Sequence, residues 1–203
     1  MAGVSETIVR EYFELNGFLV RQFRKHVAPA VRDDDDIDFL VLNPQPQTPS
    51  AELSFLLSAP ELKFVERAIV ILKAWHTDIF TPALLTHTPD FFRFLEKRSF
   101  QVAAAGLGKG GTLLKLLVVP DLPKEAQLRD QSAAILRSKG LDGAISFPTM
   151  LAYLVNQVEP NRNYQKSDLL QLIRILKNYD LFKEPQLDLF RTKRKRKPTR
   201  VAS

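Results

Sequence analysis

Apolar residues along the chain follow two spacings, one typical of helices and one typical of buried strands. Residues 5–15 place Ile8, Val9, Tyr12 and Phe13 on one helical face after Ser5, which suits a helix N-cap. Four short apolar runs, each bounded by glycine, proline or polar residues, predict strands at 18–23, 37–43, 69–73 and 112–119. Helical spacing returns in four later segments, 90–101, 125–138, 148–158 and 167–182.

The order of these elements predicts an α/β fold. A first helix precedes a three-strand meander, a crossover helix and a parallel fourth strand, and the chain then becomes all-helical. The proline-led segment 60–68 has helical spacing and predicts a short helix before the third strand. We expect an α/β core over 1–145, a helical extension packed on it over 146–184, and a basic, disordered tail over 185–203.

Composition excludes several kinds of site. The chain has 203 residues, enough for one medium domain, and it contains no cysteine and three histidines. A disulfide scaffold, a thiolate zinc site and a cysteine nucleophile are therefore excluded, and a multi-histidine metal site is disfavoured. The N-terminus lacks a secretory pattern and no apolar run reaches membrane-spanning length. We expect a cytoplasmic protein with no membrane partner.

The positive charge of the chain is concentrated near its C-terminus. Segment 191–200 carries seven basic residues and no acid; without these seven charges the formal net charge falls from +6 to −1. The candidate nucleic-acid contacts in this segment are Lys193, Arg194, Lys195, Arg196 and Lys197. Such a cluster binds phosphates without reading base sequence, although a solvated chain end has the same composition.

Charged residues also stand at the ends of the predicted strands. Asp36 and Asp38 flank the start of the second strand on one face, because residues two apart in a strand point the same way. Lys73 ends the buried run 69–73, where desolvation of an ammonium is costly unless it has a partner or a role. Glu6 lies on the first helix, eleven residues before Gly17.

These residues carry a resemblance to a known family. Over roughly residues 5–120, the chain resembles the restriction-endonuclease-like superfamily, whose signature is PD-(D/E)XK, and within it the resolvase-like branch. The resemblance rests on the spacing of Glu6 from Gly17-Phe18, on the triplet Asp36-Ile37-Asp38 in the second strand, and on Ile71-Leu72-Lys73 at the end of the third. It implies a Mg²⁺-dependent endodeoxyribonuclease in which Asp38, Glu6 and Lys73 are catalytic.

In such an enzyme the cation stabilises the transition state of phosphodiester hydrolysis and supplies hydroxide. The resemblance makes Asp38 the principal Mg²⁺ ligand, Glu6 an outer ligand and Lys73 the group that orients the attacking water. Asp36 shares a face with Asp38 and would add a second carboxylate. DNA is the implied substrate.

The chain departs from the family at one position, since Ile71 stands where the second acid belongs and isoleucine cannot bind a metal ion. Either Asp36 or an acid from a neighbouring element completes the site, or the protein is a pseudonuclease. Three acids are nearest in sequence: Asp78, Asp90 and Glu96. The literal acid-X-Lys match in 60–63 is excluded because it falls on the predicted short helix.

Alternatives without catalysis remain open for the same residues. Lys73 forms an ion pair with Glu6 or Asp38 and binds no metal, or it serves the reaction. Trp75 and His76 either cover the strand end or stack on a base. The C-terminal helices pack on the sheet or form a homodimer or protein-partner interface, in which case the chain is a non-catalytic interaction module.

Overall fold

The computed structural model describes residues 2–22, 37–49, 52–74, 76–88, 92, 95 and 111–182. The chain divides into two compact units, Met1–Gln157 and Val158–Ser203, and each is described by itself. None of the described helices combines the length and the apolar composition needed to cross a membrane.

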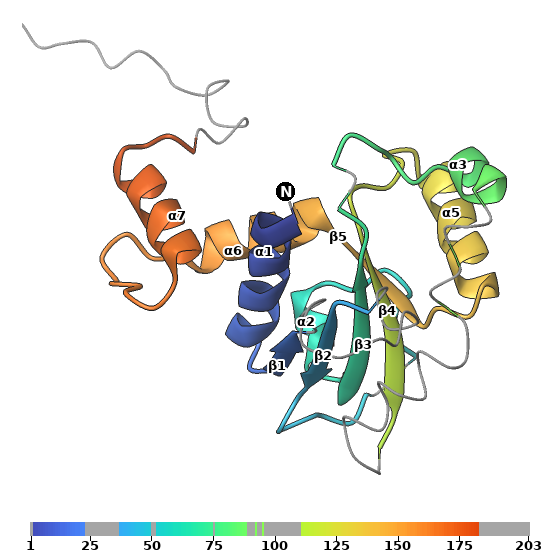
Figure 1. Ribbon diagram of the computed structural model, residues 1–203, viewed down its shortest axis with the longest axis horizontal. Helices are drawn as coiled ribbons and strands as arrows, with labels where there is room; N and C mark the ends of the chain where they lie inside the picture. The colour runs from blue at the N-terminus through green and yellow to red at the C-terminus, as the bar shows by residue number, and fades with distance from the viewer. Residues whose placement is uncertain are drawn as a thin grey trace, which may run out of the picture. The chain divides into compact units, whose positions relative to one another are not determined.

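The first unit is built on a five-stranded mixed sheet with strand order β1-β2-β3-β4-β5 (Figure 1). Its strands are β1 (Leu19–Gln22), β2 (Phe39–Leu42), β3 (Arg67–Leu72), β4 (Leu113–Val119) and β5 (Gly143–Ser146). The pairs β1–β2 and β2–β3 are antiparallel, whereas β3–β4 and β4–β5 are parallel. The predicted α/β class, the three-strand meander and the parallel fourth strand are therefore confirmed.

Strand β5 was not predicted from the sequence. It has only four residues, and its first two, Gly143 and Ala144, carry little apolar signal. Its position is fixed by contacts: Leu57 N–H donates to the Ala144 carbonyl (2.9 Å) and Ala144 N–H donates to the Phe55 carbonyl (2.8 Å). A side chain at Gly143 would meet Leu57 and Leu116 at 3.0 Å, so a small residue is required there.

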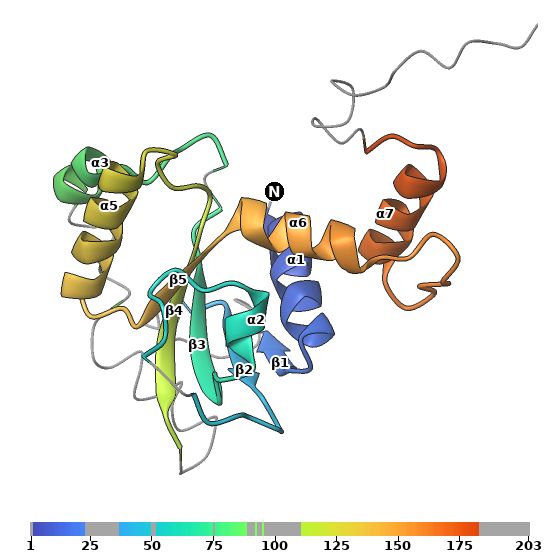
Figure 2. The same cartoon turned by 180° about the vertical axis from the view of Figure 1, so that it is seen from behind.

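Helices cover both faces of the sheet (Figures 1 and 2). One face carries α1 (Ala2–Leu15) and α6 (Phe147–Gln157), where the rings of Tyr12 and Tyr153 meet edge to face with centroids 5.3 Å apart. The other face carries α3 (Pro82–His87) and α5 (Ala126–Ser138). Apolar residues of β2, β3 and β4 form a buried cluster with these two helices and the segments beside them.

The short helix expected before the third strand is α2 (Ala59–Leu62). Glu61 Oε2 accepts hydrogen bonds from the Ser58 N–H (2.6 Å) and hydroxyl (2.7 Å), which satisfies the helix start. Glu61 therefore serves the helix cap, which agrees with excluding 60–63 as a nuclease motif. Of the helix predicted at 90–101, only Phe92 and Leu95 lie within the described residues.

The second unit contains α7 (Asp168–Asn178), whose N-cap is Ser167: its Oγ accepts from Leu170 N–H at 3.3 Å. The preceding loop is held by two basic side chains of this helix. Arg174 Nε donates to the Pro160 carbonyl (2.9 Å) and Lys177 Nζ to the Val158 carbonyl (2.8 Å). These cations stabilise the loop conformation.

Candidate functional site

Asp38 and Lys73 lie at neighbouring strand ends, as the sequence predicts. Asp38 N–H donates to the Val70 carbonyl (3.2 Å), and its Oδ2 accepts from Leu72 N–H at 2.6 Å, so Asp38 adjoins the carboxyl end of β3. Lys73 follows directly, and its N–H donates to the Val118 carbonyl of β4 (3.0 Å). Both residues therefore lie at the edge of the sheet that is formed by the carboxyl ends of the parallel strands.

Glu6 reaches this edge from the first helix. Its Oε2 accepts a hydrogen bond from Gln22 Nε2 at 2.7 Å, and Gln22 is paired with Phe39, the residue after Asp38. The three proposed catalytic residues thus come from α1, the start of β2 and the end of β3. Asp36, the further candidate ligand, lies outside the described residues, as does Trp75.

Ile71, at the position of the missing acid, is fully buried (0% exposed). It belongs to the apolar cluster that also contains Phe80, Leu85 and Leu117, contributed by the segment before α3, by α3 and by β4. The side chains around position 71 are therefore arranged for an apolar group. A carboxylate there would be desolvated, and a phosphate would have no access to it.

The described residues do not provide a complete magnesium site. Mg²⁺ favours octahedral oxygen coordination from carboxylates, waters and phosphate. No group of three or more Asp, Glu or His side chains within the described ranges is placed to hold a metal ion. One oxygen of Asp38 is engaged by the Leu72 N–H, and Asp78 joins no such group. Asp90 and Glu96 fall outside the described residues.

Beside this edge is a cavity of about 450 Å³ that the sequence did not reveal. Its lining comes from α1, from the segments that follow β3 and β4, and from α6: Val4, Ser5, Ile8, His76, Pro120, Asp121, Phe147, Pro148 and Leu151. Open α/β sheets bind ligands outside the carboxyl ends of their strands, and this cavity lies beyond the carboxyl ends of β4 and β5. Here β4 leads to α5 and β5 leads to α6, on opposite faces (Figure 2).

A hydrogen bond between Ser5 and His76 organises one wall of this cavity. Ser5 Oγ lies 2.7 Å from His76 Nε2, and the imidazole ring packs edge to face on Phe147 with centroids 4.5 Å apart. Ser5 was predicted to be the N-cap of the first helix, and this is wrong because α1 begins at Ala2. Its hydroxyl contacts a residue 71 positions away, a pairing that local spacing cannot indicate.

Comparison with known protein families, curated proteins and solved structures finds no match to this chain.

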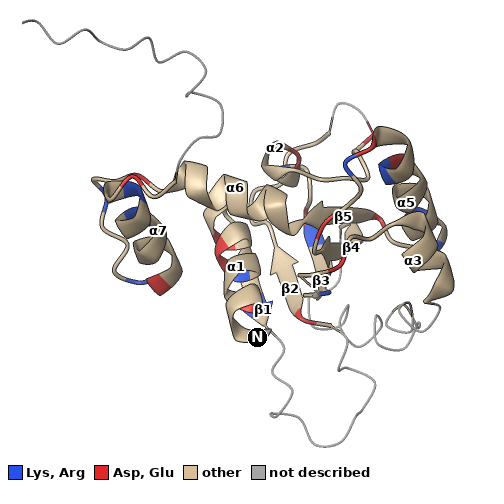
Figure 3. Cartoon of the chain, turned by 90° about the horizontal axis from the view of Figure 1, so that it is seen from above, with Lys and Arg blue, Asp and Glu red and all other residues tan. Residues whose placement is uncertain are grey.

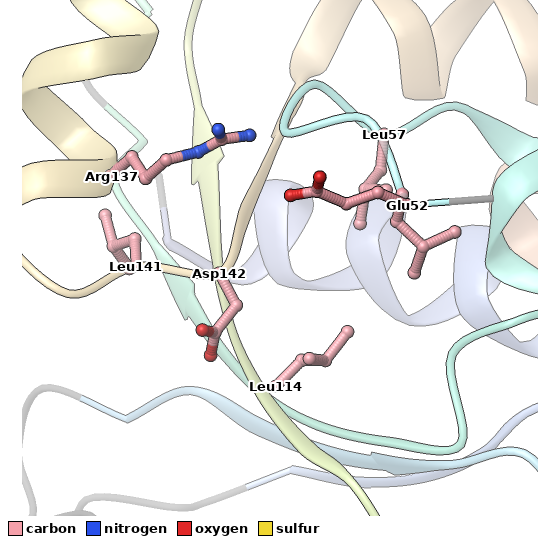
Figure 4. A pocket seen from close by; sticks show the side chains of 7 residues that line it. Glu52, Leu57, Leu114, Arg137, Leu141 and Asp142 are labelled. Carbon is pink, nitrogen blue, oxygen red and sulfur yellow. The ribbon is translucent and has the colours of Figure 1, made fainter.

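A second cavity, of about 350 Å³, lies at the opposite end of the parallel strands (Figure 4). Arg137 of α5 and Glu52 extend into it, above an apolar floor that includes Leu114 and Leu141. Asp142 also lines it, and its Oδ2 accepts from Lys115 N–H at 2.7 Å. This cavity presents both signs of charge, and at least one of its carboxylates stabilises the junction of β4 with the residue preceding β5.

Basic and acidic residues both occur along α1, α5 and α7, as the blue and red segments of the ribbon mark (Figure 3). These helices therefore present mixed charge, unlike the basic segment near the C-terminus. That segment includes the predicted nucleic-acid contacts Lys193, Arg194, Lys195, Arg196 and Lys197, which lie outside the described residues.

Proposed function

We propose that this protein is a DNA-binding pseudonuclease: a restriction-endonuclease-like core that binds DNA without cleaving it. The observation that carries the proposal is Ile71, which is fully buried where the family places its second metal-binding acid. The order of helix, antiparallel meander and parallel strand supports the family assignment. The approach of Glu6, Asp38 and Lys73 to one edge supports it as well.

The absence of cleavage follows from the chemistry of the reaction. Hydrolysis by this route needs a cation that binds the phosphate and lowers the pKa of a water molecule, and such a cation needs converging oxygen ligands. Asp38 uses one carboxylate oxygen to hold Leu72 N–H, and Ile71 contributes none. Lys73, directly after β3, carries an amine of the kind that contacts DNA phosphates.

Affinity for DNA in this proposal comes mainly from segment 191–200. Its seven positive charges release counterions from the duplex, whereas the rest of the chain has a formal net charge of −1. Each phosphate contact contributes about −0.9 to the slope of log K against log salt concentration. Deletion of residues 191–203 should therefore make the slope less steep by up to about 6 if every basic residue contacts a phosphate.

Two assays test this function. Supercoiled plasmid is incubated with the full chain and either Mg²⁺ or Mn²⁺, and we expect no nicking. Anisotropy of a labelled duplex is measured over a salt series for the full chain, for the deletion of 191–203, and for Lys73→Ala. Metal-dependent nicking that Asp38→Ala abolishes would overturn the non-cleaving part, and an absence of duplex binding at low salt would overturn the DNA-binding part.

A second function, self-association, is favoured by the exposed apolar face of α7. Leu172, Ile175 and Tyr179 follow helical spacing and are 52%, 42% and 74% exposed. A stripe of this kind suits an isologous contact with a second copy of the chain. Sedimentation velocity should show a dimer that Leu172→Lys dissociates and the control Asn178→Lys preserves; a monomeric wild type at every concentration would exclude this function.

A further inference from the structure

We propose that the 450 Å³ cavity between α1 and α6 binds a single unstacked nucleobase that carries an exocyclic amine. This inference rests on the proposed DNA-binding function and assigns a role to a site distinct from the acid-X-Lys motif. The ligand class follows from the walls, the polar groups and the position of the cavity.

The walls are predominantly apolar and come from two helices. Val4 and Ile8 of α1 oppose Phe147 and Leu151 of α6, and Pro120 follows the end of β4. Val4 is 67% and Leu151 39% exposed, so apolar surface remains uncovered at the mouth. A planar heterocycle buries its two faces against such walls, as bases do on apolar and aromatic platforms.

Two polar side chains give the cavity a preference among bases. Asp121 Oδ1 accepts from Leu122 N–H (2.8 Å), and Oδ2 has no hydrogen-bond partner within the described part of the chain. A carboxylate oxygen accepts from the exocyclic amine of adenine, cytosine or guanine. Thymine has no exocyclic amine: its only donor on that edge is N3–H, which lies between two carbonyl oxygens that repel a carboxylate. The cavity should therefore favour amine-bearing bases over thymine.

His76 supplies a fixed imidazole at the same site. Its Nε2 is bound to Ser5, which is only 2% exposed, and its ring is held against Phe147. Nδ1 then remains as the polar atom that can meet a ring nitrogen or carbonyl of the base, since the described residues give it no partner. This arrangement presents a polar atom of a held ring to one edge of the ligand.

The location connects the cavity to the phosphate-binding edge. Ser5 precedes Glu6 on α1, and His76 follows Lys73 by three residues. A DNA strand with a phosphate at Lys73 would bring its neighbouring nucleotide to the cavity mouth. A base can enter only if it leaves the stack, which costs least in a bulge or mismatch.

Duplexes containing one bulged A, C, G or T, and a fully paired control duplex, are the probes for this site. The full chain should bind bulged A about tenfold tighter than the paired duplex, with little gain for bulged T. Leu151→Trp fills the cavity and should abolish the gain. The control Leu128→Trp changes a leucine of α5 that is 37% exposed and away from the cavity, and it should preserve the gain. Thermal unfolding verifies that both variants fold.

Three outcomes separate the two proposals. If paired and bulged duplexes bind equally, or if Leu151→Trp keeps the gain, the base site is overturned while DNA binding stands. If no duplex binds, the proposed function is overturned, and the site is tested by the NMR shift of the His76 imidazole on titration with adenosine or thymidine monophosphate. A shift that adenosine monophosphate alone produces, and that Leu151→Trp removes, supports the site with a free nucleotide as the source of the base; no shift overturns it.

Discussion

The two ends of the parallel strands use their charged residues in different ways. Where β3 and β4 begin, Arg67 Nη2 donates to the Gly111 carbonyl (2.6 Å) and Glu66 Oε2 accepts from Thr112 N–H (3.2 Å). Asp142, just before β5, accepts from the backbone of β4 in the same way. At this end, charged side chains bind backbone atoms of neighbouring strands and so fix the strand starts.

At the carboxyl ends, polar side chains bind one another beside an open cavity. Glu6 pairs with Gln22 and Ser5 with His76, and Asp121 keeps one oxygen without a described partner. Groups held by other side chains at a cavity mouth remain able to meet a ligand. The first end therefore holds its charged groups in structural contacts, and the second is the end at which we propose binding.

Asp38 is an exception to this contrast between the two ends. It lies at the binding end, but its contact with Leu72 N–H at 2.6 Å matches that of Asp142 with Lys115 N–H at 2.7 Å. The sequence singled out Asp38 as a metal ligand because of its triplet, whereas its geometry resembles that of a strand-fixing carboxylate. Substitutions can decide between these roles.

The largest effect is expected at Ile71. Ile71→Glu places a carboxylate among Phe80, Leu85 and Leu117 and should lower the free energy of unfolding by more than about 4 kcal/mol, enough to unfold many domains. The matched control Ile71→Val removes one methyl group and should cost about 1 kcal/mol. Urea denaturation measures both. A stable Ile71→Glu protein that nicks plasmid with Mg²⁺ would show instead that this position opens to the active site.

A moderate effect should distinguish the roles of Asp38 and Asp142. If both fix strands, Asp38→Ala and Asp142→Ala each leave a backbone N–H without its charged acceptor and each lower the free energy of unfolding by about 1–3 kcal/mol. Chemical denaturation of the two variants side by side measures this. A loss for Asp142→Ala combined with an unchanged or raised stability for Asp38→Ala would return Asp38 to a functional role.

The sequence predicted those parts of the fold that have strong local patterns. Helical spacing located α1, α5, α6 and α7, and the apolar runs located β1 to β4. Strand β5 was missed because two of its four residues are glycine and alanine, and its position depends on backbone bonds to Phe55 and Leu57. Local spacing has no signal for such a strand.

The candidate site was predicted only in part, because some of its features depend on contacts between residues far apart in the sequence. The resemblance to the restriction-endonuclease-like superfamily predicted that Asp38 and Lys73 lie at one edge, and the backbone bonds of Asp38 to β3 agree with this prediction. Covering of Ile71 by Phe80 and Leu85 is a tertiary contact, and so is the bond between Ser5 and His76. The cavity is also a tertiary feature, because its walls come from α1 and α6, which lie on the same face of the sheet.

The smallest effect, and one of opposite sign, is expected at the buried hydroxyl of Tyr12. Its hydroxyl is buried without a hydrogen-bond partner among the described residues, and burial, with smaller contributions from Tyr153 and Glu61, raises its pKa well above the usual range. Tyr12→Phe removes this unpaired group and should raise the free energy of unfolding by about 1 kcal/mol at neutral pH.

The stability of the protein should also depend on the ionisation of Tyr12, because its pKa is higher in the folded than in the unfolded state. The contribution of the protonated hydroxyl to the free energy of unfolding is complete below the unfolded pKa of about 10 and is lost as the pH rises through the folded pKa. Urea denaturation from pH 7 to 11 should therefore show an alkaline loss of stability that is reduced in Tyr12→Phe and largely kept in the control Tyr153→Phe, whose ring is only half-buried. A destabilised Tyr12→Phe protein would mean instead that the hydroxyl has a partner in solution.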